Sequence, residues 1–101
     1  MANADKDHLI KRFVKLCERE NEKHASYDAS LSLGGSSFDN MHNNDRYNLA
    51  YGVVSGFIQA VECMDMSAFA FRNDNDYIVG VEVDGIRYPV TVASYYKEGA
   101  A

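Results

Sequence analysis

The stretch from Tyr77 to Val92 constrains the fold more than any other part of this sequence. It consists of two β-rich runs on either side of the pair Asp84-Gly85. An Asp-Gly pair between such runs predicts a β-hairpin, because a type I′ turn needs positive φ angles at both central residues. Folding the chain about this pair places every second residue of both strands on one apolar face, which another layer must cover: Tyr77, Val79, Val81, Val83, Ile86, Tyr88, Val90 and Val92.

A third strand is expected just before this hairpin. Residues 68–72 read Ala-Phe-Ala-Phe-Arg, and a polar Asn-Asp-Asn-Asp turn follows them. We expect Phe71 to pair with Tyr77, because this register adds both phenylalanines to the apolar face. Pro89 has no N–H group to donate, so its strand is expected at the sheet edge, with residues 77–83 in the middle. The sequence therefore predicts a C-terminal β-meander.

Two helices are expected ahead of the sheet. The first should span residues 5–23, where apolar side chains recur at helical spacing. The second should span residues 44–64, and its main apolar stripe includes Val54 and Phe57. More apolar residues lie on a second side of this helix, which predicts burial on more than one side: Leu49, Val53, Ala60 and Cys63.

Small residues also recur along the second helix, at Gly52, Gly56 and Ala60. Each glycine inside a helix costs about 1 kcal/mol relative to alanine, so a compensating contact is expected. The favoured explanation is the close approach of the first helix or the sheet of the same chain. The alternative is an interface with a second copy, which would make the protein a homodimer.

Residues 27–33 allow two interpretations. Apolar and polar residues alternate there as in a half-buried strand, and Gly34-Gly35 then breaks the run. The segment is either a short extra strand or a long surface connection. We therefore expect one α+β domain over residues 1–101, with two helices packed on one face of a three- to four-stranded antiparallel sheet.

The charge balance disfavours direct binding to nucleic acid or to an anionic membrane. The chain has 10 Lys and Arg against 15 Asp and Glu, a formal net charge of −5. Four cations cluster on the outer side of the first helix, and we interpret them as a solvated helix face rather than a nucleic-acid contact: Lys11, Arg12, Lys15 and Arg19.

Several features point to a cytoplasmic protein. The N-terminus shows no basic leader followed by an apolar core, as a secretion signal would. The apolar stretch over residues 47–64 is interrupted by polar residues and is not expected to span a membrane. Cys17 and Cys63 both lie on predicted core faces, which favours core packing over a disulfide or a catalytic thiol.

No motif predicts chemistry. The histidines His8, His24 and His42 have no metal-ligand spacing with one another, and there is no Cys-x-x-Cys. Residues 73–76 lack the glycine and glutamate that a calcium loop needs, and residues 34–37 lack the ending of a phosphate-binding loop. We therefore predict no catalytic residue, no cofactor and no metal.

The remaining hypothesis is a small acidic module that binds another protein. Acidic side chains in predicted turns and loops would recognise a basic or nucleic-acid-binding partner, with two aromatic anchors nearby. A specific form of this hypothesis is an anti-CRISPR-like inhibitor from a phage or mobile element, directed at a host defence nuclease. The predicted contact residues are Asp28, Asp39, Asp74, Asp76, Asp84, Tyr27 and Phe38.

Two other classes remain open from the sequence. One is a small enzyme or ligand-binding protein with a pocket between the sheet and the helices. The other is an oligomeric structural component. Retention of a small ligand would favour the first class, and a large self-assembly the second.

Overall fold

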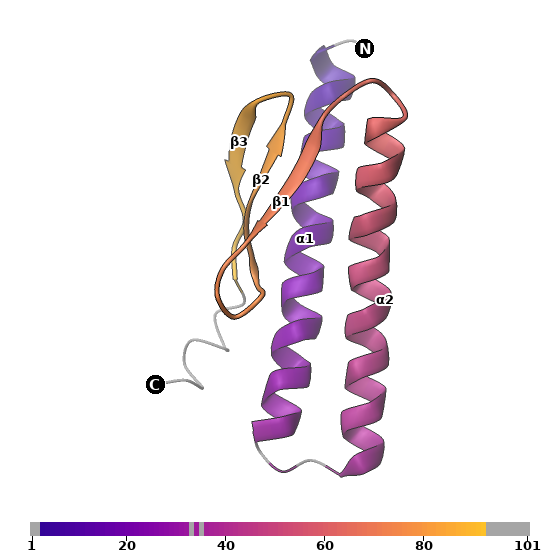
Figure 1. Ribbon diagram of the computed structural model, residues 1–101, viewed down its shortest axis with the longest axis vertical. Helices are drawn as coiled ribbons and strands as arrows, with labels where there is room; N and C mark the ends of the chain where they lie inside the picture. Colours follow the sequence, from indigo (N-terminus) through magenta and orange to yellow (C-terminus); the bar gives the residue numbers. More distant parts are fainter. Residues whose placement is uncertain (1–2, 33, 35, 93–101) are drawn as a thin grey trace.

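A long helical hairpin lies beside a small antiparallel sheet in the computed structural model, which describes residues 3–32, 34 and 36–92 (Figure 1). The sheet has the strand order β1-β2-β3, so β2 is central as predicted. Both helices pack against it, α1 beside β2 and α2 beside β1. The predicted α+β architecture is therefore confirmed, with three strands. The elements are α1 (Asn3–Ser32), α2 (Ser37–Glu62), β1 (Ala68–Arg72), β2 (Ile78–Val83) and β3 (Ile86–Pro89).

Both helices are longer than the sequence pattern predicts. Residues 27–32 continue α1, so both interpretations of that segment, strand and surface connection, are wrong. Tyr27 stacks on Tyr47 of α2 there, with ring centroids 6.3 Å apart. The second helix begins at Ser37 instead of residue 44, because the Ser36 hydroxyl accepts a hydrogen bond from the Asp39 N–H at 3.1 Å and caps the helix.

The core fills the space between the two helices and the inner face of the sheet. Phe13 of α1 is fully buried and stacks on Phe57 of α2 at 5.4 Å between ring centroids. The last turns of α1 and the first turns of α2 extend past the sheet (Figure 1). The buried residues of the cluster are Ile10, Phe13, Cys17, Val54, Val61, Ala68, Ile78, Val81, Val83 and Val90.

The predicted β2–β3 hairpin is confirmed in its register. Val83 pairs with Ile86 and Gly80 with Pro89. Asp84 and Gly85, the two turn residues, have φ angles of 49° and 84°, as the turn type requires. Pro89 therefore lies on an edge strand, where its missing N–H removes no hydrogen bond between strands.

The β1–β2 register differs from the prediction. Phe71 pairs with Gly80 instead of Tyr77, so the phenylalanines lie on the outer face and Phe69 is 52% exposed. The small side chain of Ala68 faces the helices instead and is buried. A bulge next to Phe71 also shifts β2 by one residue, which buries Ile78 and leaves Val79 42% exposed. The single predicted apolar face is therefore wrong at Val79. Ile86 pairs with Val83 as predicted, but it is exposed.

Polar side chains of α1 attach the sheet to the helices. The buried Asn21 donates to the Ile78 carbonyl at 2.7 Å and accepts from the Ile78 N–H at 2.8 Å. Glu20, with a fully buried side chain, receives two hydrogen bonds from the Arg72 guanidinium. Burial lowers the pKa of Arg72, but the hydrogen bond and the charge of Glu20 outweigh it and hold that pKa above its usual value. The sequence pattern gave no sign of these contacts.

Candidate functional site

One side of α2 is apolar and exposed over the second half of the helix. We call it the outer face of α2 and define it by residues that recur every three or four positions, ending at the C-cap: Leu49, Val53, Gly56, Ala60 and Cys63. All five are exposed, Leu49 at 71% and Val53 at 45%, whereas Ala50, Val54 and Val61 are buried. The predicted burial of this helix on more than one side is therefore wrong for the single chain.

The glycines of α2 contact nothing in this chain that would require them. A Cβ added at Gly52 or Gly56 would meet no atom within 4 Å. The favoured prediction, close approach of α1 or the sheet at these positions, is wrong. Both residues are exposed beside Leu49 and Val53.

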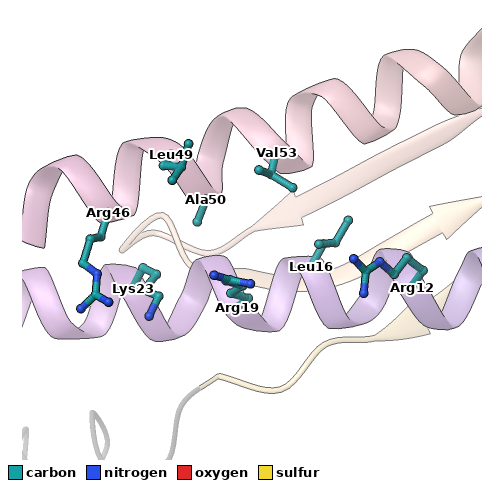
Figure 2. Close-up of a pocket in the computed structure, with 8 residues that line it drawn as sticks. All are labelled: Arg12, Leu16, Arg19, Lys23, Arg46, Leu49, Ala50 and Val53. Carbon is teal, nitrogen blue, oxygen red and sulfur yellow. The ribbon is translucent and has the colours of Figure 1, made fainter.

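A groove with a basic rim runs along this region, between α1 and α2. It has a volume of about 310 Å³. Figure 2 shows its side chains converging from the two helices, with the strands behind them. The floor is apolar, and cations lie at the sides. The lining residues are Arg12, Leu16, Arg19, Lys23, Arg46, Leu49, Ala50 and Val53.

Helical spacing explains why these residues meet. Positions 12, 16, 19 and 23 are separated by four, three and four residues, so they lie on one line along α1. Positions 46, 49, 50 and 53 make the facing line of α2. Three cations therefore border the groove from α1, and Arg46 borders it from α2 (Figure 2).

The groove cations have no ion-pair partner within 4.0 Å among residues 3–32, 34 and 36–92. Two other cations are paired: Lys6 with Asp84 at 2.8 Å, and Arg72 with Glu20 at 2.7 Å. The Arg87 guanidinium lies 4.0 Å from the centre of the Phe71 ring. Lys11 and Lys15 in addition have no ion-pair partner among the described residues, so unpaired positive charge follows α1 and extends to Arg46 of α2 in a protein whose net charge is −5.

A second groove lies on the other side of α1, against β3. Its volume is about 530 Å³, and Tyr88 and Pro89 form its sheet wall. Lys11, Arg12 and Lys15 supply positive charge from α1. Glu18 also lines it, so its charge is mixed.

The predicted acidic contact residues do not form one surface. Asp84 accepts hydrogen bonds from the Lys6 amine and the Ser67 N–H, and these bonds hold its pKa below the usual value. Asp28 accepts a hydrogen bond from the Tyr77 hydroxyl at 2.7 Å. Lys6 and Asp28 are separated by about 33 Å along α1, at 1.5 Å per residue. Two of the predicted residues are therefore engaged within the chain and lie far apart.

The other predicted contact residues are divided among different elements. Asp74 and Asp76 are exposed in the β1–β2 turn, and Asp39 is exposed in the first turn of α2. Tyr27 is half-buried against Tyr47. Phe38 is 75% exposed in the first turn of α2, and its ring stacks on His42 at 6.3 Å between centroids.

A buried cluster around His24 has some features of a catalytic arrangement. The imidazole lies between the rings of Tyr47 and Tyr77, at centroid distances of 4.4 and 4.1 Å, and its Nε2 is 3.5 Å from the Asp28 carboxylate. However, Nδ1 is buried and has no hydrogen-bond partner among the described residues. His24 itself is 7% exposed. A substrate does not reach this nitrogen. We therefore interpret the cluster as a packing contact that links α1, α2 and Tyr77, the residue before β2.

Metal and thiol chemistry receive no structural support. No group of three or more His, Cys, Asp or Glu residues that could hold a metal occurs in the part of the chain that the structure describes. Burial raises the pKa of the Cys17 thiol to about 12, which keeps it protonated and unreactive. Cys63 is exposed, so its predicted core position is wrong, and both thiols are free.

Comparison with known proteins gives no assignment. No family model matches the chain, and no curated protein or solved structure is significantly similar to it. Within the described ranges, neither helix combines the length and apolar character needed to cross a membrane.

Proposed function

We propose that this protein is an interaction module that binds another protein through the outer face of α2 and the adjoining basic groove. One observation carries the proposal. The sequence of α2 has the apolar pattern of a helix buried on two sides, yet the folded chain buries one of them. A partner that covers Leu49 and Val53 would complete the burial that the pattern predicts.

The glycines add to this argument. Gly52 and Gly56 each lower helix stability by about 1 kcal/mol relative to alanine. No contact within the described chain requires a missing side chain there. A partner helix or loop that approaches the α2 backbone closely would require it, which makes this helix suited to binding rather than to stability alone.

The proposal moves the binding surface away from the acidic turns. Asp28 and Asp84 already bind groups of their own chain, whereas the groove cations have no ion-pair partner among the described residues. An anti-CRISPR-like inhibitor remains a specific prediction within this proposal, whereas a basic partner at the exposed turns is the alternative to it. An intracellular location fits the proposal, because Cys17 and Cys63 are free thiols.

Affinity purification with matched variants tests the proposal. Leu49→Glu places a charge in the centre of the outer face, and Ile86→Glu makes the same kind of change on the sheet, where Ile86 is 56% exposed. We expect wild type and Ile86→Glu to retain the same partner and Leu49→Glu to lose it. Thermal melts of all three confirm that each is folded.

The proposal fails if no protein is retained, or if Leu49→Glu retains the partner as well as wild type does. Native mass spectrometry of the purified protein tests the alternative class. A small molecule that stays bound would favour a ligand-binding function over the proposed one.

A further inference from the structure

We infer that the partner segment is an acidic amphipathic helix, which lies along the basic groove and the outer face of α2. This inference rests on the proposed function and specifies the chemistry of its partner. It follows from the shape of the groove, the charges at its rim and the small residues beside it.

The walls of the groove favour a helix over an extended peptide. Both walls are α-helices, whose backbone N–H and C=O groups are already bonded within α1 and α2. An extended segment placed between them would find no strand edge to satisfy its own backbone. A helix forms its backbone hydrogen bonds internally, so it needs only an apolar contact with the groove. Leu16, Ala50 and Val53 provide this contact.

The rim charges specify acidic side chains at defined intervals. Arg12, Arg19 and Lys23 border the groove from α1 over about 16 Å, at a rise of 1.5 Å per residue. A helix lying nearly parallel or antiparallel to α1 advances at the same rate. Its Asp or Glu residues should therefore recur at intervals of seven and four residues, so that they face Arg12, Arg19 and Lys23. Its apolar residues should lie on the adjacent face of the partner helix.

The α2 wall of the groove allows a partner helix to approach its backbone closely. Beyond Val53 the outer face continues into Gly56 and Ala60, where the backbone of α2 is nearly bare. A partner helix that follows the groove can therefore come nearer to α2 than larger side chains would allow. An apolar residue of the partner is expected over Gly56, next to those that fill the groove.

A second copy of this chain does not supply the required charges. No two Asp or Glu residues on α1 or α2 are seven positions apart in the sequence. Pairing the same face of two copies would also bring the groove cations toward each other, which costs free energy. Nucleic acid would supply negative charge, but it would place phosphates beside Leu49, which is 71% exposed and apolar.

Peptide display tests this inference directly. A phage-displayed library of random 18-residue peptides is selected on the wild-type protein, and the enriched peptides are synthesised with a fluorophore. We expect them to be helical when bound, with Asp or Glu at seven- and four-residue intervals and apolar residues on the adjacent face. Arg19→Glu and Arg46→Glu should each weaken their binding at least tenfold, as measured by fluorescence anisotropy.

Arg87→Glu is the matched control, because it changes the net charge equally on the face of the sheet that points away from the helices. It should leave the affinity within about twofold of wild type. Gly56→Leu should also weaken binding at least tenfold while the helix remains folded.

The inference is overturned if no peptide is enriched, if the enriched peptides are not acidic, or if Arg46→Glu and Arg87→Glu have equal effects. Tighter binding of a duplex DNA oligonucleotide or of anionic vesicles than of the enriched peptides would also overturn it. Enrichment of non-acidic peptides whose binding Leu49→Glu abolishes would leave the proposed function standing and refute the acidic partner. Dimerisation of the free protein that Gly56→Leu abolishes would identify a second copy as the occupant.

Discussion

Asn21 shows how one buried polar residue positions the sheet. Its amide satisfies the N–H and C=O of Ile78 and also donates to the Thr91 carbonyl at 3.1 Å. Asn21→Leu should destabilise the protein, because each buried polar group left unpaired costs about 1–3 kcal/mol. Chemical denaturation measures the loss. Asn48→Leu, at an exposed position of α2, is the control and should change stability by less than about 0.5 kcal/mol.

Asp84 makes stability depend on pH in a predictable direction. The hydrogen bond from Lys6, with a second from the Ser67 N–H, lowers its pKa from the ordinary 3.8. Its contribution to stability is therefore complete above pH 3.8 and is lost as the pH falls through the lower folded-state pKa. Asp84→Asn keeps a residue that tolerates positive φ but removes this charge. The difference in Tm between wild type and Asp84→Asn should be largest near neutral pH and should shrink in acid; a difference that grows in acid would contradict this assignment.

At the scale of the element, α2 combines a stable inner side with an outer side that is not optimised for stability. Gly52→Ala and Gly56→Ala should each stabilise the free protein by about 0.5–1 kcal/mol, because the added Cβ meets nothing within 4 Å. Denaturant titrations measure the gain. Gly80→Ala is the contrasting variant, since its Cβ would lie 3.3 Å from the Tyr88 carbonyl oxygen, and it should not stabilise. Destabilisation at Gly52 or Gly56 would show that these residues already have a close neighbour in the protein in solution.

Local sequence signals predicted some elements well and others not at all. The Asp84-Gly85 turn and the edge position of Pro89 depend on backbone chemistry that the residues themselves carry, so the β2–β3 register could be predicted. The β1–β2 register depends on a bulge and on the contact of Asn21 with Ile78, which are 57 positions apart in the sequence. Such a distant contact leaves no periodic trace in either segment. Residues 27–32 alternate as a strand would but continue α1, and the cap at Ser36 starts α2 seven residues before the predicted position 44.

At the scale of the whole molecule, the groove between α1 and α2 brings cations from both helices together in an acidic chain. The sequence showed the cations of α1 but not their position beside α2, because that depends on how the two helices pack. It also showed the apolar second side of α2, but the pattern predicted burial of that side, whereas Leu49 and Val53 are exposed. Asp74, Asp76 and Asp84 lie in turns, as predicted. How far apart these turns lie in space could not be predicted from the spacing of the residues in the sequence. The candidate site was therefore visible as residues and not as a surface.

The two possible binding surfaces make opposite kinetic predictions for the partner that affinity purification recovers. Arg46→Glu changes the net charge from −5 to −7, and the double variant Asp74→Asn/Asp76→Asn changes it from −5 to −3. If an acidic partner binds the groove, Arg46→Glu should slow association severalfold, and the Asn variant should leave it unchanged or slightly faster. Binding of a basic partner at the turns predicts the reverse.

Stopped-flow association rates of the three proteins, measured between about 50 and 500 mM salt, separate these two outcomes. Raising salt slows both kinds of encounter, because exposed charges are screened beyond a Debye length of about 10 Å at 0.1 M. The salt dependence alone therefore does not distinguish the surfaces, but the sign of each variant's effect does. Slower association of the Asn variant together with an unaffected Arg46→Glu would return the binding site to the acidic turns.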